Sequence, residues 1–351
     1  MVGSFVSRLL VGCALVLGAE SQVNAQSLHD TLVQTYLSNP QIQAERARLR
    51  ATDEDVPRAW GGFRPSIGLT GEVGAASDEY DSAGRITTQN RNPKQLSLQL
   101  TQSLYNGGRD VADVVRSEFA VARGRAGLAS NEQTVLLNAV TAFYDLKRAQ
   151  EVMALTSDNV SSLEEQAEAT KRRYAVNDVT VTDVAQAEAR LARGISEQSL
   201  AEGNLASARS AYERVVGMPP GDNLTAPNMP LAVLPASLPE TREAAKNNPD
   251  IDLARYAERM ARAEVDMAFS DLLPDVSIRA GRRWTSETDQ EDLDRQTDEI
   301  VVQLTVPLYE GGVAHAQTRS AKHTVSQRRE QLTDERRRIN DLANRRWEEL
   351  Q

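Results

Sequence analysis

The chain contains the same layout twice, and this duplication limits its possible folds more than any other feature. Asn39-Pro40 recurs as Asn248-Pro249, and Pro65 and Pro274 each follow the proline of their own pair by 25 positions. Asn before Pro is typical of a helix start, with Asn as N-cap and Pro at the first helical position. Each copy is therefore predicted to open with one helix, which runs to about Trp60 in copy one and Asp271 in copy two.

A second block of similarity closes each copy. The runs 100–108 and 304–312 both begin with Leu-Thr and end with Tyr-x-Gly-Gly. The offset between matching positions falls from 209 (39 to 248) to 204 (100 to 304), so copy one holds five more residues between Pro65 and Leu100. Extra length is tolerated best in surface loops, and we expect a polar loop there.

Between these landmarks each copy holds two segments in which apolar and polar residues alternate. This period of two is typical of a strand with one apolar face, so each copy is predicted to form a hairpin of about 10-residue strands. Two interpretations fit the alternation: a half-buried sheet in a soluble domain, or transmembrane strands whose lipid-facing and lumen-facing residues alternate. The apolar positions include Ile67, Leu69, Val73, Leu96, Leu98, Leu100, Leu104, Val276, Ile278, Ala280, Trp284, Ile300, Val302, Leu304 and Val306.

A long helical hairpin follows the first pair of strands. No proline occurs between Pro93 and Pro219. Apolar or small residues spaced alternately by three and four run from Ala139 to Tyr174, and again from Val184 to Val215, which is the seam of a coiled coil. Two such seams joined by a short turn predict an antiparallel pair of helices. A first helix from 108 to about 175 would be ~100 Å long at ~1.5 Å per residue.

A Pro-rich linker, residues 217–239, separates the two repeats, 26–216 and 240–351. Its prolines exclude a continuous helix, so an extended equatorial belt is expected. The long helix of copy two begins at Gly312 and is still running at Gln351 without a C-cap signal. We therefore expect the second repeat to be incomplete.

The first 25 residues are typical of a secretory signal peptide. Arg8 precedes an apolar run, and Val23-Asn24-Ala25 supplies a small-x-small cleavage site. We do not expect lipidation at Cys13, because the apolar run continues past it. The chain is therefore predicted to leave the cytoplasm.

Charge and motifs exclude several classes of function. Lys and Arg are interspersed with Asp and Glu, and no long basic run indicates nucleic acid. We find no phosphate-binding loop and no zinc-protease motif, and the three histidines have no ligand spacing. We predict a protein that is not an enzyme, with no catalytic residues, no cofactor and no metal site.

The duplication, the paired amphipathic strands, Tyr-x-Gly-Gly entering a long helix, and the segment 174–190 at the helical turn together resemble the TolC family of outer-membrane factors. The resemblance implies a mainly α fold with a small β part: tandem long helical hairpins form an α-barrel, and each chain of a homotrimer adds four strands to one 12-stranded transmembrane β-barrel. It also implies a passive duct of a tripartite efflux pump or type I secretion system, in the outer membrane with a long periplasmic portion. Its partners would be outer-membrane lipid, a periplasmic adaptor (membrane fusion protein) and, through it, an inner-membrane transporter. The substrate and the particular pump are not indicated.

The strands support an oligomer without the family. Four strands cannot close a barrel, since single-chain barrels begin at ~8 strands, and an open edge in lipid would leave backbone groups unpaired. Several copies must share one barrel, and strand count alone leaves a dimer or a trimer open. On this interpretation Leu98, Leu100, Val302 and Leu304 face lipid.

The resemblance also assigns roles at the turn. Val176 matches a valine that meets the adaptor, and Asn177 and Asp178 stand where the family has Gly and Leu. Thr182 and Asp183 match a Thr-Asp pair that makes gate-closing contacts with a neighbouring hairpin. The alternative is that Thr182 only N-caps the returning helix and Asp183 favours its dipole.

Two other classes of protein remain as alternatives. A periplasmic coiled-coil adaptor also uses a long helical hairpin, but between two lipoyl-like halves. A soluble coiled-coil scaffold would need no membrane strands.

Overall fold

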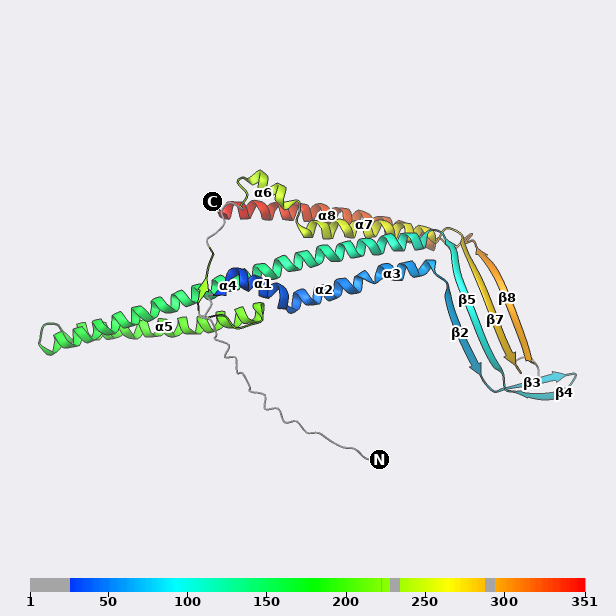
Figure 1. Cartoon of the computed structure of the whole chain (residues 1–351), viewed down its shortest axis with the longest axis horizontal. Helices are drawn as coiled ribbons and strands as arrows, with labels where there is room; N and C mark the ends of the chain where they lie inside the picture. Colours follow the sequence, from blue (N-terminus) through cyan, green and yellow to red (C-terminus); the bar gives the residue numbers. More distant parts are fainter. Residues whose placement is uncertain (1–25, 222, 228–233, 288–293, 351) are drawn as a thin grey trace, which may run out of the picture. The chain divides into compact units, whose positions relative to one another are not determined.

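The computed structural model describes residues 26–221, 223–227, 234–287 and 294–350 (Figure 1). The predicted signal peptide, with Cys13, lies outside the described residues. The chain forms two compact units, Met1–Leu37 with Leu137–Met229 and Ser38–Leu136 with Pro230–Gln351. Helix α4 (Arg109–Ala175) belongs to both, so the units cut across the sequence repeats.

The first unit is an antiparallel helical hairpin made by the second part of α4 and by α5 (Val181–Val216) (Figure 1). The predicted seams are confirmed: their residues are buried or half-buried, except for Tyr174, which is 46% exposed. Gly194 lets the helices approach, because a Cβ there would lie 2.8 Å from Leu163 Cδ1. One end of the hairpin holds a core with helix α1 (Leu28–Ser38) beside it; this core consists of Phe143, Leu146, Tyr212, Val216 and Leu224.

In the described part of the linker no helix precedes Leu238, as its prolines predict, and the extended equatorial belt stays a prediction. Within the linker, strand β6 (Leu224–Thr225) pairs in parallel with strand β1 (Gln26–Ser27). A short helix, α6 (Leu238–Ala245), begins where the linker ends, with Ser237 as its N-cap. Residues 222 and 228–233 of the linker lie outside the described residues.

In the second unit the helix starts are confirmed, but one helix end is not. Asn39 Oδ1 accepts from Gln41 N at 2.9 Å, and Asn248 Oδ1 accepts from Asp250 N at 2.8 Å. Copy two forms one helix, α7 (Pro249–Ser270). Copy one does not: α2 (Pro40–Asp53) stops, and α3 (Asp55–Trp60) with a 3-10 turn (Gly61–Phe63) follows. The prediction of one helix to Trp60 is wrong because Pro57 cannot donate to Asp53 and its ring crowds that carbonyl.

The long helix of copy two is α8 (Val313–Leu350), which packs on α6 and α7. A polar junction joins α8 and α7 to the first part of α4. Asp250 accepts from Ser130 Oγ at 2.6 Å and from Arg338 Nη2 at 3.2 Å. None of the described helices has the length and apolarity required to cross a membrane.

The four predicted strands form one antiparallel sheet in the order β2-β5-β7-β8 (Figure 1). Their bounds are Ser66–Val73 for β2, Lys94–Asn106 for β5, Asp275–Ser286 for β7 and Asp294–Thr305 for β8. The two hairpins have matching registers, with Ser66 opposite Thr101 and Asp275 opposite Thr305. The pairing of β5 with β7 joins the copies, and β2 and β8 are the outer strands of a sheet that the single chain does not close.

The predicted polar loop of copy one is instead a second hairpin. Among the described residues, strands β3 (Ala76–Ser82) and β4 (Arg85–Arg91) pair only with each other. Ala83 and Gly84 connect them with φ of 55° and 81°, the left-handed pair of a tight hairpin turn.

Candidate functional site

The sheet has one predominantly apolar face. Directly opposite residues of an antiparallel pair lie on the same face. The register places Leu98 in a row with Leu69, and Leu100 in a row with Ile67, Ala280 and Ile300. Val302 and Leu304 belong to the same face through Ile278 and Val276. The four positions that the sequence predicts to face lipid, Leu98, Leu100, Val302 and Leu304, therefore lie on one face of the sheet.

No other described part of the chain covers this face. Ile67 is 68% exposed, Ile300 76%, Val302 64% and Leu304 63%, while Leu98 is 41% exposed and Leu100 is half-buried. Isolated exposed apolar residues are common, but a contiguous face of this kind marks an interaction surface. The opposite face carries mainly polar side chains, among them Thr70, Glu72, Gln95, Ser97, Gln99, Thr101, Arg279, Arg283, Thr297, Glu299, Gln303 and Thr305.

An ion pair interrupts the apolar face, and the sequence pattern did not reveal it. Arg282 Nε lies 2.5 Å from Asp298 Oδ1, and Nη2 lies 2.9 Å from Oδ2. The guanidinium carbon of Arg282 is also 5.8 Å from the centre of the Trp284 ring. Both charges occupy apolar-face positions, and only the β7–β8 register puts them side by side.

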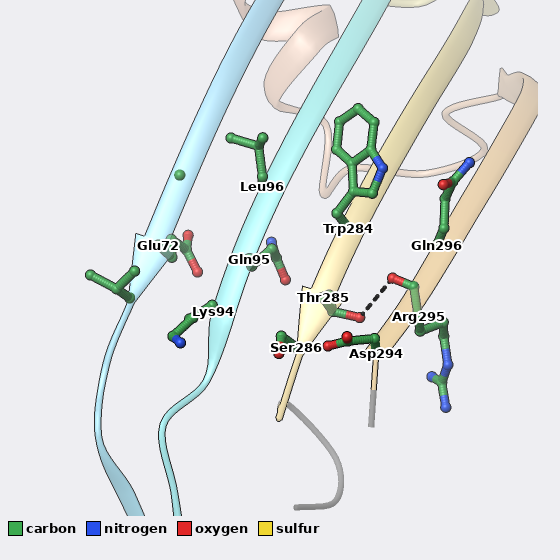
Figure 2. Close-up of a pocket in the computed structure, with 12 residues that line it drawn as sticks. Glu72, Lys94, Gln95, Leu96, Trp284, Thr285, Ser286, Asp294, Arg295 and Gln296 are labelled. Atoms are coloured by element: carbon green, nitrogen blue, oxygen red, sulfur yellow. Dashed lines mark hydrogen bonds between the residues drawn. The ribbon is translucent and has the colours of Figure 1, made fainter. Parts of the chain in front are cut away.

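All four strands contribute to a hollow of about 710 Å³ at the end of the sheet away from the helices (Figure 2). Leu96 and Trp284 are paired there on neighbouring strands. Thr285 Oγ1 donates to the Arg295 carbonyl at 3.4 Å, as the dashed line in Figure 2 marks. Lys94, Asp294 and Arg295 also line the hollow, so the sheet turns from apolar to charged at this end.

The other candidate site is the turn between α4 and α5. Val176 is 73% exposed, and Asn177 has a φ of 59°, the left-handed geometry expected of Asn replacing Gly. Asp178 N donates to the Arg173 carbonyl at 3.0 Å, while its carboxylate accepts from Arg173 Nε at 2.7 Å. The turn is thus held by local bonds, and Val176, Asn177 and Asp178 are all exposed.

The returning helix is capped by Thr180, so the assignment of the N-cap to Thr182 is wrong. Thr180 Oγ1 accepts from Asp183 N at 3.3 Å, and Asp183 Oδ2 accepts from Thr180 N at 2.8 Å, forming a capping box. Thr182 and Asp183 are both exposed. The backbone and hydroxyl bonds from Thr180 lower the pKa of Asp183 below its usual value. The spacing Thr-x-x-Asp was the sequence signal for this cap.

A lysine ties the two helices together next to the turn. Lys171 Nζ lies 3.3 Å from Glu188 Oε1 and 3.4 Å from Glu168 Oε1. The hydrogen bonds that Lys171 donates to Glu188 and Glu168 raise the pKa of Lys171. Because these groups are exposed, each pair contributes little to stability.

The sheet and the helical turn match one known family. The family model described as "Outer membrane efflux protein" matches residues 31–218 and 241–343. Outer membrane efflux protein BepC of Brucella suis biovar 1 (strain 1330) is 29% identical over 348 residues, 97% of this chain and 74% of BepC. Outer membrane protein TolC of Escherichia coli (strain K12) is 25% identical over 345 residues, 94% of this chain and 69% of TolC.

A solved structure has the same fold. A crystal structure of CusC, described in terms of transmembrane channel formation, superposes with a TM-score of 0.74 and 13% identity, covering 90% of this chain and 73% of CusC. At that identity the likeness concerns the fold alone. The match to the family model, however, covers most of the sequence. The chain therefore belongs to the outer membrane efflux protein family.

Proposed function

We propose that this chain is the outer-membrane exit duct of a tripartite efflux pump or type I secretion system. The observation that carries the proposal is the four-stranded sheet, with an exposed apolar face and two outer edges that have no strand partner among the described residues. Membership of the outer membrane efflux protein family, and the names of BepC and TolC, support the same function. The alternatives of a periplasmic adaptor or a coiled-coil scaffold are wrong, because the matched family is one of outer-membrane proteins.

In this proposal three copies share one barrel of twelve strands. Leu98, Leu100, Val302 and Leu304 face lipid, and the polar face lines the lumen, as in membrane barrels whose strands alternate. Lipid offers no hydrogen bonds to an open strand edge, so β2 and β8 need partners from other copies. The Arg282–Asp298 pair and the charged hollow beyond it then lie near the outer limit of the apolar band.

The helical turn is proposed as the docking and gating end. Val176, Asn177 and Asp178 form its exposed tip, suited to contact a periplasmic adaptor that connects to an inner-membrane transporter. Asp178 replaces the apolar contact of the family, and Arg173 already pairs with it, so adaptor recognition here is more polar. Thr182 and Asp183 are exposed on the first turn of α5, where they face a neighbouring hairpin in the proposed closed state.

Fractionation combined with electrophoresis tests the proposed function. The chain expressed with its own N-terminus should be recovered in the outer membrane on a density gradient. Unheated samples should migrate as a trimer, which boiling converts to the monomer. Recovery as a monomer in the periplasmic extract would refute the duct.

A further inference from the structure

A trough runs along helix α7 in the second unit, with the first part of α4 on one side and α8 on the other (Figure 1). The hollow has a volume of about 370 Å³, within the range of sites for small molecules. Its floor is formed by Leu253, Ala254 and Ala257 of α7, and its walls carry mainly charged side chains. We call this hollow the α7 trough. It offers an apolar surface between two charged walls.

At one end of the α7 trough the charged side chains are already paired. Arg338 Nη2 lies 3.2 Å from Asp250 Oδ2, and Arg338 Nε lies 3.0 Å from Glu335 Oε2. Ser130 Oγ donates to the other oxygen of Asp250 at 2.6 Å. Two carboxylates and one guanidinium make this end slightly negative, so it does not attract an anion.

Two other arginines of the trough have no carboxylate partner. Arg123 of α4 and Arg328 of α8 form no ion pair within the part of the chain that the structure describes. Arg328 Nη1 donates to the neutral amide oxygen of Gln331 at 2.9 Å. The lining holds three arginines and two carboxylates, so its excess positive charge lies with Arg123 and Arg328.

Arg123 reaches the trough at the level of Ala257. Helix α4 leaves the sheet after β5 and α7 enters it before β7, so the two helices are antiparallel. A Cβ on Gly127 would lie 3.6 Å from Leu253 Cδ2, which makes these two positions neighbours. Equal numbers of residues rise equally on two α-helices. Four residues nearer to the sheet, Arg123 is therefore level with Ala257.

Arg328 reaches nearly the same level from the opposite wall. Helix α8 leaves the sheet after β8 and is antiparallel to α7, and its Arg338 bonds to Asp250. Seven residues nearer to the sheet, Gln331 is level with Ala257, and Arg328 lies about one turn beyond it. The bond to Gln331 turns the guanidinium of Arg328 back towards that level. The two unpaired cations thus face one part of the floor.

We propose that the α7 trough binds a small organic anion, whose phosphate or carboxylate group bridges Arg123 and Arg328 and whose apolar part lies on the floor. Guanidinium groups bind both kinds of oxyanion through paired N–H donors, so two of them can hold one group from two sides. The apolar floor and the volume of the hollow leave room for an organic body beside the anionic group. Bound there, the anion links α4 to α8 across α7.

Titration calorimetry on the purified full-length chain, in phosphate-free buffer of constant ionic strength, tests the site. Phenyl phosphate is the main probe, and benzoate replaces it in a parallel titration. Inorganic phosphate tests the anionic group alone, and benzyl alcohol tests the apolar part alone. Phenyl phosphate should bind about ten-fold more tightly than either part, because it uses the two guanidiniums and the floor together.

Single substitutions separate the two contributions. Arg123→Gln and Arg328→Gln should each weaken phenyl phosphate about ten-fold, because each removes charge-assisted hydrogen bonds. Arg125→Gln and Arg329→Gln remove the same charge from the same helices outside the trough, and should change the affinity less than about two-fold. Ala257→Leu covers the floor, so it should weaken phenyl phosphate about ten-fold and leave inorganic phosphate within about two-fold.

The site is overturned if neither phenyl phosphate nor benzoate binds the unaltered chain. It is also overturned if Arg123→Gln and Arg328→Gln bind normally, or if Arg125→Gln and Arg329→Gln lose as much affinity as they do, since the attraction would then be to net charge. Binding of only one of the two probes assigns the anion to the phosphate or the carboxylate class. Circular dichroism checks the fold of each variant, and Arg328→Lys, which keeps the charge, should retain more affinity than Arg328→Gln. The site lies within one chain, so a periplasmic monomer that binds these probes would refute the duct and leave the site in place.

Discussion

The hydroxyl oxygen of Tyr212 lies 3.0 Å from that of Thr31, although 181 positions separate them in the chain. Both side chains are fully buried. Thr31 already donates its hydrogen to the Ser27 carbonyl at 3.1 Å, so Tyr212 is the donor in this bond. A tyrosine hydroxyl is protonated at neutral pH, and burial raises the pKa of Tyr212 further above that range. The bond fastens α1 to the end of the α4–α5 hairpin.

Removing only the hydroxyl of Tyr212 should weaken the first unit modestly. Tyr212→Phe should cost about 1 kcal/mol, the net value of one hydrogen bond, whereas Tyr212→Ala should cost about 3–5 kcal/mol because it leaves a cavity. Urea unfolding followed by circular dichroism measures both. Tyr144→Phe, at a position 42% exposed, is the control and should be neutral. An equal loss in Tyr212→Phe and Tyr212→Ala would contradict the packing role of the ring.

Arginine should distinguish the two faces of β5. Leu100→Arg places a charge on the proposed lipid face and should impair assembly by about 2–4 kcal/mol if the site lies near the bilayer midplane. Gln99→Arg, one residue away on the polar face, should assemble normally. The amount of heat-sensitive trimer in outer membranes is the measurement. Normal assembly of the first variant with failure of the second would reverse the facing.

Two neighbouring substitutions separate capping from gating at the turn. Thr180→Ala removes the N-cap and should cost about 1 kcal/mol of local stability, but it leaves the Asp183 carboxylate free for other contacts. Asp183→Ala keeps the backbone N–H that donates to Thr180 Oγ1, but it removes the carboxylate half of the capping box and any contact with a neighbouring hairpin. If Asp183 is a gate residue, only its variant should raise single-channel conductance, by a shift in the closed-to-open ratio of about 5-fold or more. If the two variants have similar conductance, Asp183 contributes to the capping box and not to the gate.

Acid should loosen the same turn. The folded-state pKa of Asp183 is depressed by its bonds from Thr180. Its contribution is therefore present above the unfolded value of about 3.9 and is lost as the pH falls through the lower folded value. The protection factor of the Thr180 amide, which donates to Asp183 Oδ2, should fall below about pH 4. In Asp183→Asn this acid dependence should disappear, and its persistence would point to another group.

The two glycines that precede the long helices have similar backbone angles, but substitution by alanine should destabilise the protein by different amounts. Gly107 and Gly311 have φ of 66° and 62°. A Cβ on Gly107 would lie 2.6 Å from the Ser270 carbonyl oxygen, whereas one on Gly311 would meet nothing within 4 Å. Gly311→Ala should cost about 1–2 kcal/mol for the left-handed backbone, and Gly107→Ala clearly more. Thermal unfolding compares the pair, and equal losses would mean that Ser270 moves aside.

Regular periodicity explains what the sequence predicted well. The spacing of three and four from Ala139 onward specifies a buried seam, and no proline interrupts it, so both long helices follow. Strict alternation likewise assigns Leu98 and Val302 to one face, since a strand turns every second side chain the same way. The sheet order could not be deduced, because it depends on the pairing of β5 with β7 across the two repeats.

The misses have local causes. Pro57 lies within the first turn of α3, where proline is tolerated. It prevents the preceding helix, α2, from continuing, because it cannot donate a backbone hydrogen bond to Asp53. The hairpin β3–β4 has polar residues on both faces, so alternation does not mark it, and only the Ala83-Gly84 turn does. Asp298 forms its ion pair with Arg282 of the neighbouring strand. The pair depends on the β7–β8 register, which neither strand's own sequence reveals.

In the part of the chain that the structure describes, the strands of the β3–β4 hairpin pair with each other and not with the four-stranded sheet. The base of the hairpin is closed separately, by Gly74 N donating to the Pro93 carbonyl at 2.9 Å and by Asn92 N donating to Glu287 Oε2 at 3.1 Å. Loop tips whose backbone serves no other element accept inserted peptides. The turn at Ala83 and Gly84 is thus a natural display position, where an epitope can be grafted while the registers of β2 and β5 remain as they are.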